Sequence, residues 1–110
     1  MNIQIFGKSK CFDTKKAERY FKERGIKFQS IDIIAKGLSK GELTSVIKSV
    51  GGLEQVVNEK GKDFCEIKYL VEEDKFDKLL ETPKLYKTPI VRNKTQATVG
   101  YCPEIWKTWE

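Results

Sequence analysis

Histidine is absent from this chain of 110 residues, and its absence removes several kinds of chemistry. There is no imidazole to act as a general base or to pair with a cysteine nucleophile. The three cysteines, Cys11, Cys65 and Cys102, are odd in number and irregularly spaced, so they predict neither a secreted disulfide framework nor a zinc site. We therefore expect free thiols, a reducing compartment, and no bound metal or cofactor.

Long apolar runs are also missing. No stretch approaches the roughly 20 apolar residues that cross a bilayer, and the first residues alternate like a strand instead of forming a secretion signal. We expect a soluble, cytoplasmic protein with no membrane partner. The length fits one domain, which we place over residues 1–110.

The net charge of +5 comes from 21 Lys and Arg against 16 Asp and Glu. Eighteen of the basic residues are lysines, and they are scattered among acidic residues along the whole chain. This pattern indicates a solvated surface better than a nucleic-acid interface, so we expect no direct contact with nucleic acid. The excess of positive charge leaves room for an acidic protein partner or an anionic small ligand.

Cys11 is the strongest candidate for chemistry. It lies between a strand-like apolar run at residues 3–6 and an amphipathic helical pattern that starts near Asp13. A thiolate at a helix N-terminus is stabilised by free backbone N–H groups and by the helix dipole. Lys8 and Lys10 add positive charge nearby. We interpret Cys11 as a nucleophile, although a lone cysteine is more often a small apolar side chain.

The periodicity from Cys11 to Gly52 predicts a helix ending near Gly25, a strand over residues 28–33, and a second helix. A strand, helix and strand in succession imply a parallel pair with a right-handed crossover. Ser39 followed by Glu42 is a capping box for the second helix, which Gly51 and Gly52 end. These elements form the first half of an α/β fold.

The second half has a different period. Residues 53–57 indicate a short helix, residues 58–62 a turn, and residues 76–80 a helix stopped by Pro83. A hairpin follows, with its turn at Asn93-Lys94 and a returning strand over residues 95–99. The last short helix should turn Ile105, Trp106 and Trp109 inward.

Thr88-Pro89 stands at the start of a strand that should lie inside the sheet, where proline is normally excluded because it lacks an N–H donor. A cis peptide bond would leave the backbone of Thr88 free to pair with an extended substrate. The alternative is a trans proline that begins an edge strand. In the cis form, Thr88 and Pro89 are candidate substrate-binding residues.

Gly100 to Cys102 join the last strand to the last helix, and Pro103 suits the first helical position. The free N–H groups of this turn could hold a substrate carboxylate. Cys102 is therefore either a resolving thiol for Cys11 or a buried residue with no redox role.

These motifs together resemble the arsenate reductase-like branch of the thioredoxin fold, which includes the Spx and YffB-type proteins. The matching segments run in order over nearly the whole chain: 5–7, 11–17, 25–28, 32, 38–39, 42–43, 58–61, 88–91 and 99–101. The resemblance implies a glutaredoxin-like mixed sheet with a helical insertion, at about residues 39–82, between its two halves. It also favours the cis form of Thr88-Pro89.

The chain departs from this family at positions that carry the chemistry. Arsenate reductases of this fold are expected to hold the oxyanion with arginines, but the matching positions here are Asn58, Thr88 and Cys102. Many Spx regulators carry a C-x-x-C switch, and Thr14 stands in place of its second cysteine. The resemblance therefore implies neither arsenate reduction nor a two-cysteine switch.

Two functions follow from this reading. In the first, the protein is a glutathione-dependent thiol–disulfide reductase with Cys11 as its only nucleophile, and glutathione or glutaredoxin as partner. Thr14 would donate to the thiolate, and Lys8 or Lys10 would lower its pKa. Lys8, the Thr88-Pro89 segment and the Gly100–Cys102 turn would bind the substrate. In the second, it is a non-enzymatic, Spx-like regulator that binds an acidic partner such as RNA polymerase.

Overall fold

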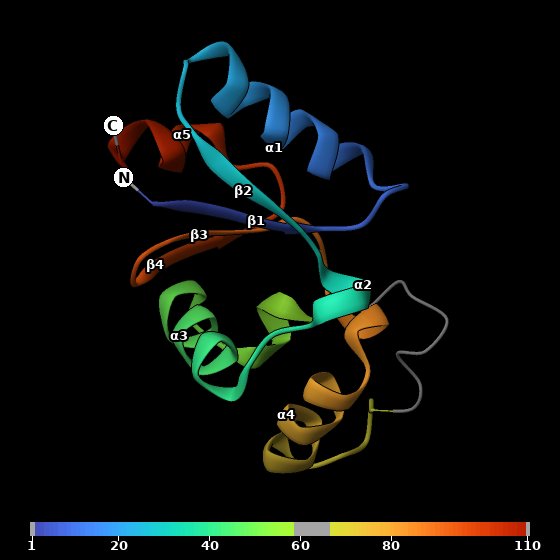
Figure 1. Ribbon diagram of the computed structural model, residues 1–110. Helices are drawn as coiled ribbons and strands as arrows, with labels where there is room; N and C mark the ends of the chain where they lie inside the picture. The colour runs from blue at the N-terminus through green and yellow to red at the C-terminus, as the bar shows by residue number, and fades with distance from the viewer. Residues whose placement is uncertain (1, 59–66, 110) are drawn as a thin grey trace.

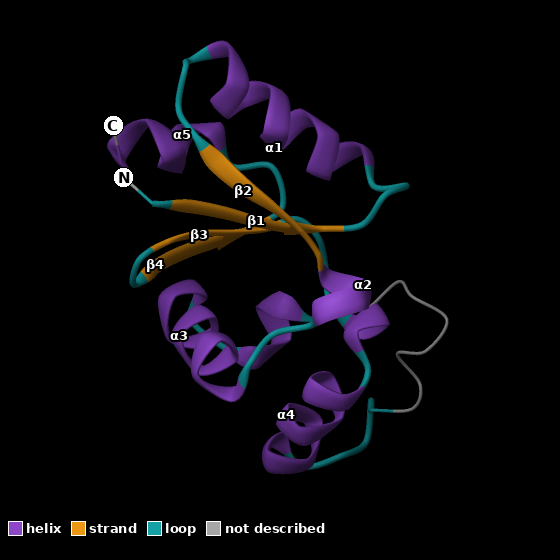
Figure 2. Ribbon diagram, viewed as in Figure 1, coloured by secondary structure: helices purple, strands orange, loops and turns teal. Residues whose placement is uncertain are grey.

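The computed structural model describes residues 2–58 and 67–109. Cys65 and most of the turn predicted over residues 58–62 lie outside these residues. A mixed sheet of four strands runs through the described part of the chain: β1 (Ile3–Gly7), β2 (Phe28–Asp32), β3 (Ile90–Asn93) and β4 (Gln96–Val99), in the order β2-β1-β3-β4 (Figure 2). The thioredoxin-like α/β architecture predicted from the sequence is confirmed.

The pairing within the sheet fixes where the functional segments meet. β1 and β2 are parallel, whereas β3 is antiparallel to both β1 and β4. Phe6 pairs with Ile90, so the end of β1, which leads to Cys11, lies beside the start of β3, which follows Pro89. The first strand and the proline-led strand are therefore neighbours inside the sheet.

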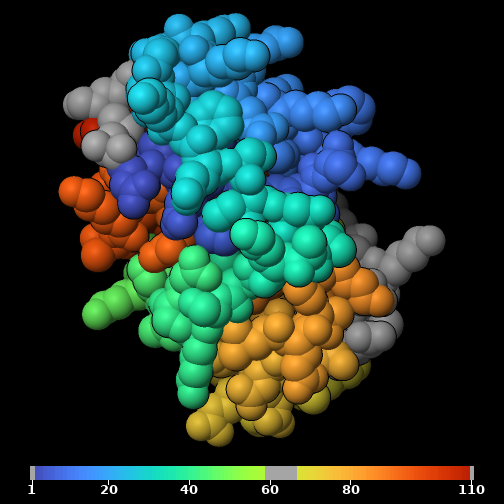
Figure 3. All heavy atoms as spheres, in the orientation of Figure 1, coloured from blue at the N-terminus to red at the C-terminus, as the bar shows by residue number. Residues whose placement is uncertain are grey.

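Helices cover both faces of the sheet. α1 (Phe12–Glu23) and α5 (Pro103–Trp106) lie on one face, and α2 (Ile33–Lys36), α3 (Lys40–Val50) and α4 (Glu72–Glu81) lie on the other side (Figure 1). Three short 3-10 helices complete the described elements: η1 (Leu53–Val56), η3 (Pro83–Leu85) and η4 (Lys107–Trp109). The space-filling view shows α2, α3 and the residues around 80 packed into one continuous surface (Figure 3).

The core on the α1 side depends on aromatic packing. α1 buries Ala17, Tyr20 and Phe21 against β1, and the ring of Trp106 lies 5.2 Å from Tyr20 and 5.1 Å from Phe21, measured between centroids. The indole N–H of Trp106 donates to the buried Thr98 hydroxyl at 2.8 Å, so this large side chain leaves no polar atom unpaired. This packing holds α1, and with it Cys11, rigidly on the sheet.

The capping box predicted for α3 is confirmed. The Ser39 hydroxyl accepts from the Glu42 N–H at 3.2 Å, and the Glu42 carboxylate accepts from the Ser39 N–H at 2.9 Å. Gly51 ends the helix in the left-handed region, with φ +90°, as a glycine can without a steric cost.

Three local predictions were wrong. Ile33, assigned to the second strand, begins the short helix α2 instead, because the Asp32 carboxylate accepts from the Ile34 N–H and caps it. The hairpin turn lies one residue later than predicted, at 94–95, with Lys94 at φ +58°. Ile105 is 42% exposed because it faces away from the core that buries Trp106.

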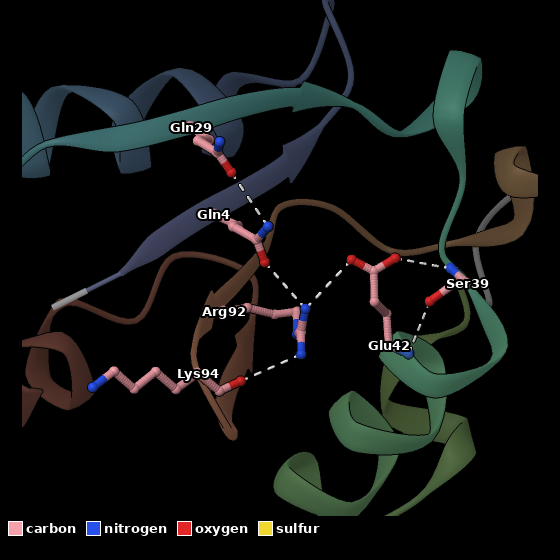
Figure 4. A network of polar contacts seen from close by, with 6 residues as sticks. All are labelled: Gln4, Gln29, Ser39, Glu42, Arg92 and Lys94. Carbon is pink, nitrogen blue, oxygen red and sulfur yellow. Dashed lines mark hydrogen bonds and ion pairs between the residues drawn. The ribbon is translucent and has the colours of Figure 1, made fainter.

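A polar network ties α3 to the sheet (Figure 4). Arg92 on β3 donates to the Gln4 side chain at 3.1 Å and to the Lys94 carbonyl at 3.3 Å, and it pairs with the Glu42 carboxylate at 3.4 Å. Glu42 thus serves both the helix cap and the ion pair. Arg92 is only 16% exposed, so its charge depends on these partners.

Substitution of Glu42 should separate these two roles. Glu42→Gln keeps an oxygen for the Ser39 N–H but removes the charge opposite Arg92, and should lower the free energy of unfolding by about 0.5–1 kcal/mol because the pair is partly exposed. Glu42→Ala removes both contacts and should cost about 1–3 kcal/mol. Urea denaturation measures both; equal losses would show that the cap contributes nothing.

Candidate active site around Cys11

Cys11 occupies the N-cap position of α1, with extended backbone at φ −92° and ψ 116°. Its N–H donates to the Lys8 carbonyl at 3.1 Å and its carbonyl accepts from Lys15 at 3.3 Å, so a tight loop delivers it to the helix. The half-buried sulfur lies 3.7 Å from the Thr88 carbonyl oxygen. The loop after β1 and the segment before β3 therefore meet at the thiol.

The pKa of the Cys11 thiol lies below the ordinary value. Partial burial acts to raise it, but hydrogen bonds to the thiolate outweigh that effect; they come from the side chains of Thr14 and Thr88 and from the backbone N–H groups of Thr14 and Asp13. These donors belong to the first turn of α1 and to Thr88, the residue before Pro89. The site can thus hold a reactive thiolate without a histidine.

Thr14 is a buried residue directly beneath this thiol. Its hydroxyl makes no hydrogen bond of ordinary length and angle in the described part of the structure, which leaves it available to donate when Cys11 is ionised. The side chain packs against Gly7, where an added Cβ would overlap the methyl, hydroxyl and Cβ atoms of Thr14. Gly7 was not predicted as a site residue. A glycine at the end of a strand is, however, a sequence signal that another segment packs closely against the backbone there.

Thr88-Pro89 is a cis peptide bond, as predicted. Pro89 is buried, and its carbonyl accepts from the Gly100 N–H at 2.8 Å, so it lies beside the turn after β4. Thr88 is half-buried beside the sulfur. The structure therefore brings together Cys11, Thr14, Thr88, Pro89 and Gly100.

The two predicted lysines differ in their surroundings. The Lys8 ammonium donates to the carbonyls of Lys84 and Tyr86, at 3.2 and 3.1 Å, and so ties the Cys11 loop to the segment that leads to Pro89. Burial lowers the pKa of Lys8, and the charge of the Cys11 thiolate opposes that change. Lys10 is exposed immediately before Cys11.

The surroundings of Cys102 make its thiol less reactive than that of Cys11. Its sulfur donates to the Val99 carbonyl at 3.4 Å and packs against the aromatic core beside Trp106. Burial raises the pKa of this thiol, the charge of Glu104 raises it further, and Lys87 offsets part of the rise. Cys102 therefore holds its proton in conditions where Cys11 loses it.

Arg92 does not lie where an oxyanion at Cys11 would need it. It pairs across the sheet with Gln4, three residues before the end of β1, and its guanidinium is engaged by Gln4, Lys94 and Glu42. Within residues 2–58 and 67–109, no three cysteine or carboxylate groups gather as metal ligands, and no helix is long and apolar enough to cross a membrane.

A sheet of this order, with a cysteine at the start of the first helix and a cis-proline facing it, defines a thioredoxin-like protein. The family model for the ArsC family matches residues 6–109. The chain belongs to the ArsC family.

Known proteins similar to this chain include a transcriptional regulator, an arsenate reductase and an ArsC family related protein. The global transcriptional regulator Spx 2 of Oceanobacillus iheyensis is 32% identical over 106 residues, which cover 92% of this chain and 78% of that protein. An arsenate reductase from Vibrio cholerae is 25% identical, with TM-score 0.84 over 96% of this chain and 94% of that one. An ArsC family related protein from Bacteroides fragilis matches at 24% identity, with TM-score 0.88 over 100% and 98%.

Proposed function

We propose that this protein is a thiol–disulfide reductase that uses Cys11 as its single nucleophile and glutathione as its reducing thiol. One observation carries the proposal. The Cys11 sulfur has a lowered pKa, is partly accessible, and lies beside the backbone of Thr88 next to the cis-proline. An extended substrate can pair with that backbone while its disulfide meets the thiolate.

The reaction proceeds in three thiol–disulfide exchanges. The Cys11 thiolate attacks one sulfur of the substrate disulfide, a new S–S bond forms, and the other sulfur leaves as a thiolate that takes a proton from solvent. A first glutathione, directly or through glutaredoxin, attacks the Cys11 sulfur of this mixed disulfide, so the second substrate thiol leaves and Cys11 is bonded to glutathione. A second glutathione attacks the sulfur of the bound glutathione, forms oxidised glutathione and releases the Cys11 thiolate. One disulfide is reduced for each pair of glutathione thiols oxidised.

The surrounding residues have separate roles in this proposal. Thr14 donates to the thiolate, and Lys10, which is exposed immediately before Cys11, supplies positive charge to the loop. Lys8 holds the segment before Pro89 in place through the Lys84 and Tyr86 carbonyls. All three exchanges need a thiol-rich, reducing setting, for which we propose the cytoplasm.

The substrate-binding side of the site is the cis-proline edge. The backbone of Thr88 aligns the substrate against Pro89. The turn from Gly100 to Cys102 receives a carboxylate through the residues after Gly100, whose own N–H donates to the Pro89 carbonyl. We propose no obligatory resolving role for Cys102, because its raised pKa makes it a poor thiolate.

Arsenate should be a poor substrate. Charge-assisted contacts contribute about 1.5–3 kcal/mol each, and the three positions where the family places arginines hold Asn58, Thr88 and Cys102. We expect reduction of hydroxyethyl disulfide by glutathione in a coupled assay, with arsenate turnover at least about 100-fold slower, a difference of roughly 2.7 kcal/mol. Arsenate turnover equal to that of the disulfide would contradict this assignment.

The similarity to Spx 2 favours a second candidate, a non-enzymatic regulator that binds an acidic surface such as one on RNA polymerase. A regulator of this kind needs no catalytic turnover. The disulfide assay separates the two candidates, because a protein that binds RNA polymerase in a pull-down but reduces no disulfide would be a regulator. Thr14 in place of a second cysteine argues against a C-x-x-C switch in either case.

A further inference from the structure

Two aromatic side chains are exposed beside Cys11. Phe12, the next residue in the chain, is 78% exposed, and Tyr101, one residue before Cys102, is 44% exposed. Each carries a lysine over its ring: the Lys15 ammonium lies 5.9 Å from the centroid of Phe12, and the Lys16 ammonium lies 5.9 Å from that of Tyr101. We call these four residues the aromatic–lysine rim.

Two segments that meet at Cys11 carry the rim. Phe12, Lys15 and Lys16 belong to the first turns of α1, whose N-cap is Cys11. Tyr101 follows Gly100, which donates to the carbonyl of Pro89, and Thr88 in turn accepts from the Cys11 sulfur. The rim residues and the cis-proline edge therefore belong to segments that meet at the Cys11 loop.

The charges around this sulfur are mostly positive. Lys10, Lys15 and Lys16 are exposed there, and Lys87 and Glu104 act on the neighbouring Cys102. The acidic side chains near these residues are Asp13 in the first turn of α1 and Glu104 on α5, together with two later residues of α1: Glu18, which lines a pocket with Lys15, and Glu23, which lines one with Lys16 and Tyr101. An exposed apolar surface rimmed by cations suits a partner with apolar and acidic side chains.

We propose that the aromatic–lysine rim is a specificity surface that selects protein disulfides flanked by acidic and aromatic residues. This inference rests on the proposed reductase function and names its substrate class. The aromatic side chain of the substrate packs on Phe12 and Tyr101, and its carboxylates face Lys15 and Lys16. The chemistry at Cys11 is the exchange described above.

Synthetic peptides test this selection. Each peptide has one cysteine in a mixed disulfide with 5-thio-2-nitrobenzoate, flanked either by glutamate and phenylalanine or by lysine and phenylalanine. Attack by Cys11 on the peptide sulfur releases the coloured thiolate, so its absorbance gives the rate. We expect the acidic peptide to react about tenfold faster at low salt, and the difference to shrink at about 0.5 M salt.

Substitutions in the rim should change the preference for the acidic peptide. Lys15→Glu combined with Lys16→Glu should reverse it, and Phe12→Ala should slow both peptides about threefold to tenfold while leaving hydroxyethyl disulfide unaffected. Lys68 and Tyr69 form a matched control. The Lys68 ammonium lies 5.4 Å from the ring of Tyr69, which is 87% exposed, near the start of α4 on the opposite side of the molecule from α1 (Figure 1).

Lys68→Glu combined with Tyr69→Ala should leave both peptide rates unchanged. Equal rates for the acidic and basic peptides, or an equal loss in the control variant, would overturn the specificity surface while leaving the reductase function intact. If the protein reduced none of the disulfides, including hydroxyethyl disulfide, both the specificity surface and the reductase function would be overturned.

Discussion

Cys11→Ser should lower the rate of disulfide reduction by at least about a thousandfold, because a hydroxyl at this position stays protonated and cannot form the mixed disulfide. Serine is nearly the size of cysteine, and the half-buried site should accept it without a change in fold. The rate is measured with hydroxyethyl disulfide and glutathione, and unfolding by urea checks that the variant is as stable as the parent protein.

Cys102→Ser is the matched control for this prediction. A single-cysteine cycle with glutathione needs no second thiol, so this variant should keep at least about half of the rate. If Cys102→Ser loses activity as fully as Cys11→Ser, Cys102 resolves the mixed disulfide, and the cycle uses two cysteines.

Gly7→Ala should have the second largest effect. The added methyl group would overlap Thr14, which is a buried residue of α1 and has little room to move. Overpacking of this kind costs about 1–3 kcal/mol of stability. Since Thr14 is also a donor to the Cys11 thiolate, its displacement should raise the pKa of Cys11 and slow alkylation at neutral pH.

Gly41→Ala provides the comparison. Gly41 lies in α3, and an added Cβ would meet no atom within 4 Å. Alanine there should stabilise the helix by about 0.5–1 kcal/mol and leave Cys11 unchanged. Were Gly7→Ala to behave like Gly41→Ala, the close packing of Gly7 on Thr14 would have no consequence for the site.

Local patterns in the sequence were enough to predict most of the elements near the site. The capping pair Ser39 and Glu42 predicted the start of α3, and Cys11 before an amphipathic run predicted the N-terminus of α1. Both predictions were possible because capping and helical periodicity depend on near neighbours in the chain. The cis form of Thr88-Pro89 needed the family resemblance as well, since a proline at the head of a strand is compatible with either isomer.

Contacts between distant segments could not be read from the sequence. The hydrogen bonds from Lys8 to the Lys84 and Tyr86 carbonyls join residues that are 76 and 78 positions apart. They show that the Lys8 ammonium binds backbone carbonyls of the protein itself, whereas the sequence predicted that it would bind substrate. Arg92, three positions after Pro89 in sequence, is turned to Glu42 by the register of β3 with β1. The packing of Thr14 on Gly7 likewise exists only once α1 lies on the sheet.

The central claim is that Cys11 is the low-pKa nucleophile of this protein. A pH titration of iodoacetamide labelling, with the labelled cysteines located by mass spectrometry, tests it most directly. The thiolate reacts and the thiol does not, so the rate at each cysteine rises through its own pKa. Cys11, with its pKa lowered, should reach half of its maximal rate at a lower pH than Cys102, whose pKa is raised. Labelling of Cys102 or Cys65 ahead of Cys11 at neutral pH would contradict the account.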